Sequence, residues 1–268
     1  MNALAARRRH PAAIAILIML GLFLTGAVYA VAAPRAATAG AVNADEVSLG
    51  KELFQANCSS CHGLNAEGRA TGNGAKIAGP ALAGVGAAAV NFQMGTGRMP
   101  MTTPGVQAPR MTADKFSDAE IAAIGAYVAS LAPGPAVPND EAVDPAKGDI
   151  ARGGELFRVN CAMCHNFAGS GGALTRGKYA PNLKDVDPTH IYEAMVTGPQ
   201  NMPVFSDSNI DPQDKRDIIA FVKHLDEQDN PGGMALGALG PVSEGLFAWI
   251  FGLGLLVACA IWLGSKSA

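Results

Sequence analysis

Residues 58–62 read Cys-Ser-Ser-Cys-His, and residues 161–165 read Cys-Ala-Met-Cys-His. A Cys-x-x-Cys-His sequence is typical of covalent attachment of a c-type haem. The spacing follows from the chemistry, because both thiols add to the vinyl groups of one haem from a short helical turn and the adjacent histidine then reaches the iron. The sequence therefore predicts two covalently bound haem c groups. The predicted attachment residues are Cys58, Cys61, Cys161 and Cys164.

Other uses of paired cysteines explain the two motifs less well. The chain has five cysteines, and a disulfide framework is the ordinary expectation in an exported domain. A thioredoxin-like motif needs a βαβ context, whereas the flanks here are rich in Gly, Ala and Pro. A zinc site needs no histidine directly after each second cysteine. The fifth cysteine, Cys259, lies in an apolar stretch and is interpreted as a small buried residue.

The two motifs lie within an internal repeat. Residues 50–58 (Gly-Lys-Glu-Leu-Phe-Gln-Ala-Asn-Cys) match residues 153–161 (Gly-Gly-Glu-Leu-Phe-Arg-Val-Asn-Cys). Each copy continues with a Pro-x-Leu segment, a Met-Pro pair and a helical pattern containing an aromatic residue, Tyr127 or Phe221. The repeat predicts an all-α fold of two tandem class I cytochrome c domains, built from short helices.

Local signals support these helices. Ser117 and Glu120 have the spacing of a capping box, and Asp211 precedes a proline suited to the first position of a helix. Gly50 and Gly153 are expected to mark the place where the last helix of each domain crosses the first. We expect Tyr127 or Phe221 to pack there against the bare glycine backbone.

His62 and His165 are the predicted proximal iron ligands. The sixth ligand can be Met, His or absent. Met99 and Met202 each follow the first cysteine of their own copy by 41 residues, and each precedes a proline. We therefore predict both as axial ligands. The alternatives are Met94, Met101 and Met111 in domain 1, and Met163, Met195, His190 and His224 in domain 2.

A ligand imidazole binds a metal best when its other ring nitrogen donates a hydrogen bond that fixes the ring. Pro80 and Pro181 recur at matching positions and are predicted to supply the accepting carbonyl, although a proline carbonyl is also an ordinary turn feature. His/Met ligation raises a haem potential and leaves no open position for a substrate. The chain is therefore expected to transfer electrons, with no catalytic residues of its own.

Residues 12–33 and about 242–263 are apolar, and each approaches the roughly 20 residues that span a bilayer. The first is longer than the apolar core of a signal peptide, about 7–15 residues, which favours an uncleaved anchor over a cleaved signal. Because basic flanks stay in the cytoplasm, Arg7–Arg9 and Lys266 place both chain ends inside. We predict a multi-pass cell-membrane protein with its haem domains on the outer, periplasmic side.

The predicted organisation has six parts. These are a basic segment and membrane anchor (1–40), cytochrome c domain 1 (45–132), a linker (133–148), cytochrome c domain 2 (149–230), a hinge (231–241) and a C-terminal transmembrane helix (242–264). The proline-rich linker is predicted to be semi-rigid. Domain 1 also carries a Pro/Thr-rich insert, residues 101–112, that domain 2 lacks; a docking surface and a solvent-exposed insertion are both compatible with it.

The charge pattern gives no support for nucleic-acid binding. Lys and Arg number 6 against 7 Asp and Glu in residues 45–131, and 8 against 12 in residues 149–230. Neither domain therefore has the basic excess that steers a free carrier to acidic partners. Anchoring in a complex makes such steering unnecessary, because it already gives a high effective concentration.

Two cytochrome c domains, the segment Gly-Pro-Val-Ser-Glu-Gly-Leu at residues 240–246 and one terminal membrane helix resemble the dihaem cytochrome c subunit of the actinobacterial cytochrome bcc complex. The resemblance covers nearly the whole chain. It implies a menaquinol-oxidising reductase with a cytochrome b subunit and a Rieske iron–sulfur subunit as partners, associated with an aa-type cytochrome c oxidase. It also implies that domain 2 receives electrons from the Rieske protein and domain 1 delivers them, an order that the residues themselves do not fix.

Three alternatives remain at this point. One is the dihaem subunit of a cbb-type oxidase, and another is the cytochrome subunit of a periplasmic dehydrogenase. The third, a dihaem peroxidase, needs a haem with an open or displaceable ligand. The two matched Met-Pro pairs speak against the peroxidase.

Overall fold

The computed structural model describes residues 11–32, 43–71, 76–102, 105–228, 236–238 and 241–265. The chain divides into two compact units, Met1–Ala41 and Val42–Ala268. In the first unit the described residues form one helix, α2 (Pro11–Ala32). The predicted flanks Arg7–Arg9 and Lys266, and most of the predicted hinge 231–241, lie outside the described residues.

Domain 1 is a small helical domain. Its helices are α3 (Ala44–Asn57), α4 (Ser59–His62), α5 (Gly86–Gly95) and α6 (Asp118–Leu131). A short antiparallel hairpin, β1 (Arg69–Thr71) and β2 (Lys76–Gly79), lies between α4 and α5. Helix α6 packs against both α3 and α5. The buried core consists of Phe54, Ala66, Val90, Met94, Ile121, Ile124, Tyr127 and Val128.

Domain 2 repeats this order of elements, as the internal repeat predicts. Its elements are α8 (Ile150–Asn160), α9 (Ala162–His165), β3 (Gly172–Ala173), η2 (Thr175–Gly177), β4 (Tyr179–Ala180), α10 (Pro188–Thr197) and α11 (Pro212–Glu227). Strands β3 and β4 pair antiparallel, and α11 packs on α8. The fold is therefore all-α with two cytochrome c domains, each carrying a two-stranded hairpin. The buried core consists of Val143, Phe157, Cys161, Ile191, Met195, Ile210, Ile218, Ile219 and Val222.

The helix starts follow from their capping residues. Ser117 and Glu120 form the predicted capping box at the start of α6, and Asp211 accepts a hydrogen bond from the Asp214 N–H at the start of α11. Each cap satisfies backbone donors that a helix start leaves without an intrahelical partner.

The first and last helices of each domain cross at a glycine, as expected. A Cβ on Gly50 would strike the backbone carbonyl of Ala123, and one on Gly153 would strike that of Asp217. The atoms nearest to Gly50 and Gly153 belong to the backbone of the crossing helix and not to an aromatic ring, whereas the Phe221 ring lies against the next glycine, Gly154, at 3.0 Å from the position of a Cβ. Tyr127 packs on Phe54 and Phe221 on Phe157, each pair with ring centroids 5.3 Å apart.

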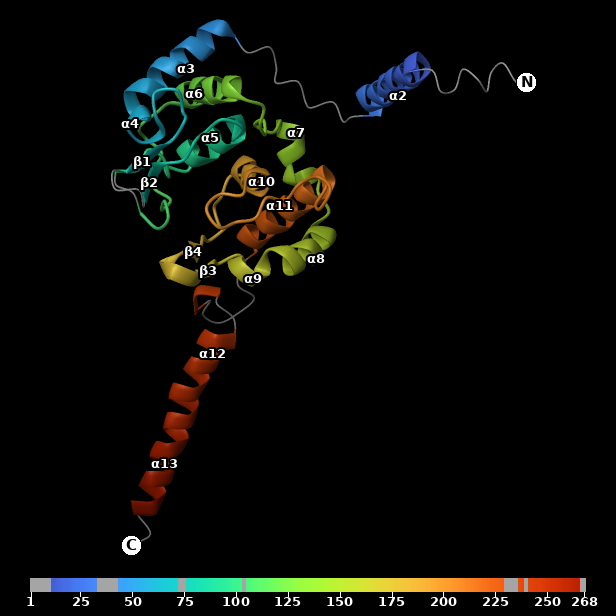
Figure 1. Ribbon diagram of the computed structural model, residues 1–268. Coiled ribbons are helices and arrows are strands. Elements are labelled where there is room, and N and C mark those ends of the chain that lie inside the picture. Colours follow the sequence, from blue (N-terminus) through green and yellow to red (C-terminus); the bar gives the residue numbers. More distant parts are fainter. Residues whose placement is uncertain are drawn as a thin grey trace, which may run out of the picture. The chain divides into compact units, whose positions relative to one another are not determined.

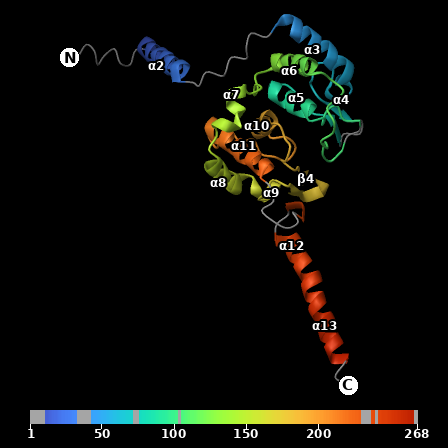
Figure 2. The same ribbon diagram turned by 180° about the vertical axis from the view of Figure 1, so that it is seen from behind.

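The two domains contact each other directly. Helices α5 and α10 pack side by side (Figures 1 and 2). The start of the linker lies along α5, where the Ala88 N–H donates to the Pro135 carbonyl at 3.1 Å. The linker then forms two short helices, α7 (Asp140–Val143) and η1 (Pro145–Lys147), which contact α11. The linker is thus packed against both domains along its length.

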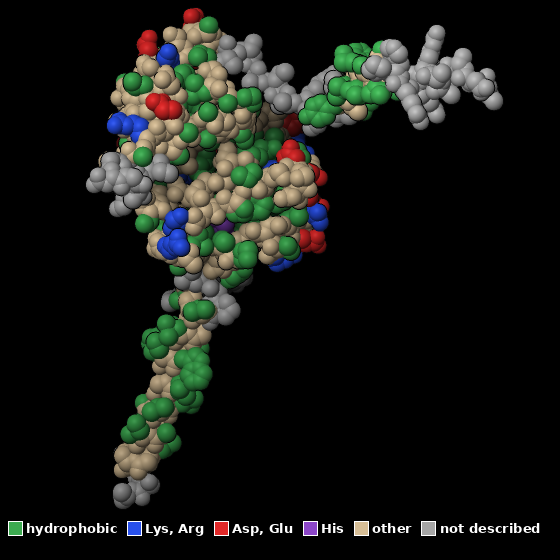
Figure 3. Space-filling model, in the orientation of Figure 1, with side chains coloured by type: hydrophobic (Ala, Val, Ile, Leu, Met, Phe, Trp, Pro, Cys, Tyr) green, Lys and Arg blue, Asp and Glu red, His purple; other side chains and the backbone are tan. Residues whose placement is uncertain are grey.

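In the part of the chain that the structure describes, two helices are long and apolar enough to cross a membrane, at Ala12–Tyr29 and Val242–Ser265. The second is made of α12 (Pro241–Phe247), a π-helical stretch η4 (Ala248–Leu253) and α13 (Gly254–Ser265). Figure 3 shows hydrophobic side chains along this helix. Cys259 lies on α13 within this apolar helix, and no other part of this chain that the structure describes buries it.

Gly50 offers a direct test of the helix crossing in domain 1. Replacing Gly50 with Ala should lower the free energy of unfolding by about 1–3 kcal/mol, the usual cost of overpacking. Gly125→Ala is the matched control, since its new Cβ would lie 3.5 Å from the Ala87 Cβ, an ordinary contact. Urea unfolding followed by far-ultraviolet circular dichroism measures both variants. Equal midpoints for the two variants would contradict the crossing.

Candidate haem sites

Each Cys-x-x-Cys-His motif forms a single tight turn at the end of a long helix. In domain 1 the N–H groups of Cys61 and His62 donate to the Cys58 carbonyl at 3.1 and 2.9 Å. The corresponding bonds to the Cys161 carbonyl in domain 2 have the same lengths, 3.1 and 2.9 Å. One turn therefore carries both thiols and the histidine. All five cysteines are free, so the disulfide alternative is not present in the structure.

Burial makes the first thiol of each motif a poor nucleophile. It raises the pKa of Cys58, and it raises the pKa of Cys161 to about 12. A reactive Cys-x-x-Cys motif needs the opposite shift, because the thiolate is the nucleophile. Attachment of a ligand by thioether bonds thus fits these cysteines better than thiol–disulfide exchange.

The histidine rings are fixed by proline carbonyls, as predicted. His62 Nδ1 lies 2.8 Å from the Pro80 oxygen, and His165 Nδ1 lies 2.9 Å from the Pro181 oxygen. With Nδ1–H donating, Nε2 keeps its lone pair for a metal. Burial also lowers the pKa of His165, more than its hydrogen bond to Pro181 raises it, which favours the neutral ring that binds metals.

Two glycines that the sequence analysis missed shape the loop carrying each proline. Gly68 and Gly171 have φ of +84° and +82°, and their N–H groups donate to the His62 and His165 carbonyls at 2.7 and 2.9 Å. A Cβ on Gly171 would lie 2.9 Å from the Pro181 carbonyl carbon. The signal was available, because each glycine follows the first cysteine of its copy by 10 residues.

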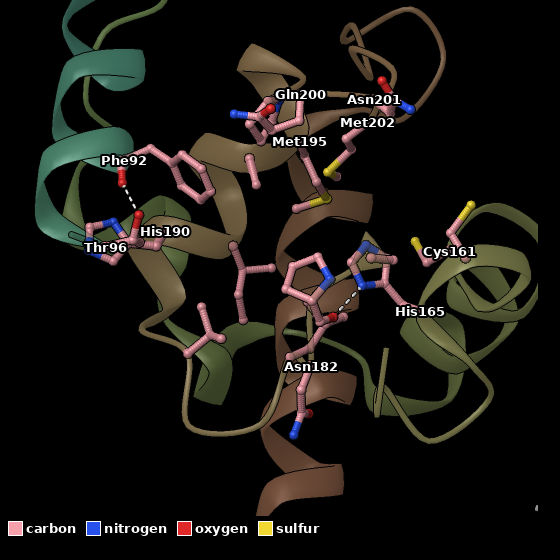
Figure 4. Close-up of a pocket in the computed structure, with 18 of the residues that line it drawn as sticks. Phe92, Thr96, Cys161, His165, Asn182, His190, Met195, Gln200, Asn201 and Met202 are labelled. Carbon is pink, nitrogen blue, oxygen red and sulfur yellow. Dashed lines mark hydrogen bonds between the residues drawn. The ribbon is translucent and has the colours of Figure 1, made fainter. Parts of the chain in front are cut away.

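Domain 2 contains a deep, mostly apolar cavity of about 1200 Å³, counting the open space at its mouth. Cys161, Cys164, His165 and Met202 all line it. Figure 4 shows the Met195 and Met202 side chains reaching into the cavity opposite the His165 ring, with Cys161 beside that ring. Two thiols, an imidazole and a thioether around an apolar space are the donor set that a haem c requires. The residues therefore fit the group.

The predicted methionines lie on different elements from Met94 and Met195. Met94 and Met195 occupy the last turns of α5 and α10 and are buried core residues, and Met195 also lines the cavity, whereas Met99 and Met202 lie on the loops that follow. The alternative Met101 lies on the same loop as Met99 and is half-buried. Met99 packs against the core cluster of domain 1 that includes Cys58. Met163 and Met111 are 85% and 66% exposed, which suits neither for an iron buried in a domain.

His190 and His224, the alternative histidine ligands in domain 2, have different surroundings from the predicted ligand Met202. His190 lines the cavity, but its Nδ1 lies 2.9 Å from the Glu193 carboxylate and its ring packs against Gly95 of domain 1. His224 lies on α11 outside the cavity lining. Neither position matches a methionine of domain 1.

Comparisons with known proteins also indicate cytochrome c domains. A family model described as cytochrome c matches residues 47–132, and one described as cytochrome c oxidase, cbb3-type, subunit III matches residues 148–222. Proteins named cytochrome bc1 complex cytochrome c subunit are similar over almost the whole chain. The relative from Corynebacterium efficiens is 44% identical over 97% of this chain and 90% of its own length. The relative from Mycobacterium tuberculosis is 44% identical over 94% and 90%, and that from Mycobacterium leprae 41% identical over 94% and 87%.

Gly171→Ala tests whether the loop of Pro181 needs its glycine. The new Cβ would press on the backbone around Pro181, so we expect the free energy of unfolding to fall by about 1–3 kcal/mol more than in the control. The control is Gly177→Ala, because Gly177 also has positive φ, +73°, but has nothing within 4 Å of a new Cβ. Urea unfolding measures both variants, and equal losses of stability would refute this role.

Proposed function

The chain belongs to the family of cytochrome c subunits of the cytochrome bc1 complex, and on this basis we propose that it is the dihaem c-type cytochrome of a respiratory menaquinol:cytochrome c reductase. In this proposal it relays electrons from a Rieske iron–sulfur protein to a terminal aa-type oxidase. The observation that carries the proposal is the repeated donor set, in which a thiol pair, a fixed imidazole and a methionine loop occur in the same order in both domains.

Each domain has a complete set of residues for one haem. Cys58 and Cys61, and likewise Cys161 and Cys164, attach it by thioether bonds. His62 and Met99, and His165 and Met202, would bind its iron, and Pro80 and Pro181 orient the histidines. Haem bound in this way supplies a one-electron Fe(III)/Fe(II) couple.

The chain's own residues keep each site closed to substrates. His62 with Met99, and His165 with Met202, would occupy both free positions of a bound haem iron, and the cavity walls of domain 2 are largely apolar. Water-excluding walls and fixed ligands favour electron transfer over bond chemistry. The chain is therefore an electron-transfer subunit of an oxidoreductase complex, with no reaction of its own.

The proposed partners and location follow from the family and from the two apolar helices. A cytochrome b subunit and a Rieske subunit surround the chain in the membrane, and the haem domains lie on the outer, periplasmic side between two spans. Domain 2 accepts electrons and domain 1 passes them to the oxidase. The match to the cbb3-type subunit model covers domain 2 alone, whereas the full-length relatives cover both domains and both apolar helices, which favours the bc1-type complex.

Gentle detergent extraction tests the partners. An affinity tag on this chain should recover a cytochrome b and a Rieske protein together with it if it is a subunit of the proposed reductase, and its relatives are named as subunits of a cytochrome bc1 complex. Mass spectrometry identifies the recovered subunits. Recovery with a cbb-type oxidase core, and without cytochrome b and a Rieske protein, would overturn the assignment.

Methionine-to-leucine variants test the axial ligands. Leu has nearly the volume of Met, so the fold should tolerate the change, but Leu cannot bind iron. Met99→Leu and Met202→Leu should each abolish the Met-ligated visible absorption band of one haem. Met94→Leu and Met195→Leu are matched controls on neighbouring helices and should keep both bands. A spectrum unchanged in Met99→Leu or Met202→Leu would refute that ligand.

A further inference from the structure

The cavity of domain 2 is not built by domain 2 alone. Five of the residues that line it belong to domain 1, namely Phe92, Thr96, Arg98, Gln107 and Arg110. Phe92 lies on α5 and the others follow it, on the loop that carries Met99 and on the insert 101–112. The insert therefore contacts domain 2 within this chain, and the wall of the second site is completed by the first domain.

Among the described residues that line this cavity, the two arginines are the only ones of the types Lys, Arg, Asp and Glu. Arg98 is only 8% exposed, and its guanidinium lies over the Phe92 ring at 4.8 Å. Within the described part of the chain, neither Arg98 nor Arg110 pairs with a carboxylate side chain. A positive charge removed from water without an anionic partner costs several kcal/mol. Arg98 is such a charge, and Arg110, which is exposed, adds a second positive charge at the same cavity, so the cavity favours an anion.

Contacts between the domains hold these arginines in place. The Gln107 side-chain amide makes two hydrogen bonds of 2.8 Å to the backbone N–H and carbonyl of Tyr179, as a neighbouring strand would. Arg110 donates to the Asp185 carbonyl at 3.3 Å. Since Tyr179 itself lines the cavity, the insert is fastened at the edge of the site.

We propose that Arg98 and Arg110 bind the propionate carboxylates of the haem in domain 2. This inference rests on the proposed haem at Cys161, Cys164, His165 and Met202. A haem carries two carboxylates on one edge, and in an otherwise apolar cavity these carboxylates need cations. Arginine suits the task because its planar guanidinium binds a carboxylate through two parallel hydrogen bonds and stays charged. The unpaired arginines and the carboxylates thus satisfy each other.

The arrangement links the two haem sites through neighbouring residues. Arg98 faces the cavity of domain 2, and the next residue, Met99, is the proposed ligand in domain 1. Positive charge next to a haem opposes the extra positive charge of Fe(III) and so raises the potential. Domain 1 therefore sets part of the potential of the haem in domain 2.

Redox titration of the full chain in detergent, followed by visible absorption, tests this inference. Arg98→Gln combined with Arg110→Gln should lower the equilibrium constant for reduction of the domain 2 haem about tenfold. For a one-electron couple, this lowers the midpoint potential by about 59 mV. The domain 2 transition is the one that Met202→Leu shifts. Replacing Arg98 with Lys instead of Gln keeps the charge and should restore most of the lost midpoint potential. Arg176→Gln is the control, because Arg176 is an exposed arginine of domain 2 that does not line the cavity.

The outcomes separate this inference from the function on which it rests. Absence of a second haem transition in the unmodified chain would overturn the proposed function itself. If both haem transitions are present but the midpoint potential of the domain 2 haem is no lower in the double variant than in Arg176→Gln, only the role of the arginines is overturned. This holds even if the double variant unfolds more easily. A wild-type midpoint that falls or rises with inorganic phosphate at constant ionic strength would show that a free anion occupies the arginines, and would also overturn it.

Discussion

Each domain depends on one hydrogen bond, from the histidine of the Cys-x-x-Cys-His turn to a proline carbonyl. It measures 2.8 Å in domain 1 and 2.9 Å in domain 2. To form it, the turn at the end of the first helix and a loop 16 to 18 residues later must meet. A glycine with positive φ lets that loop pass close to the turn, and the crossing of first and last helices fixes where the turn stands. The packing of a whole domain thus serves the orientation of one imidazole.

Much of this was predictable because it is local and repeated. The motifs predicted the attachment cysteines and the proximal histidines, and the repeat singled out Met99 and Met202 as candidate ligands. The small size of Gly50 predicted a close crossing of helices. Gly68 and Gly171 were missed although the repeat contained them. The contact of the insert with domain 2 had no signal in the sequence, because Gln107 and Tyr179 lie 72 residues apart and occur in only one copy. A repeat predicts the features that both copies have in common. The contact between the two domains depends on residues that only one copy has.

The contact between α5 and α10 also contains a buried polar group. Glu193 is fully buried, and it is held by His190 at 2.9 Å and by Asn91 of domain 1 at 2.8 Å. Burial raises the pKa of this carboxyl, and the two hydrogen bonds oppose that shift. Such a group tolerates only one arrangement of its partners, since a lost hydrogen bond would leave it unsatisfied. It therefore specifies how the two domains dock, and with them the separation of the two sites.

A cavity with walls from two domains has a consequence for the order in which the protein matures. Domain 1 precedes domain 2 in the chain and is synthesised first, yet Phe92 and Arg98 complete the wall around the Cys161 and Cys164 thiols. In the docked arrangement domain 1 covers part of the access to those thiols, so the proposed attachment of haem in domain 2 is easier before the two domains dock than after.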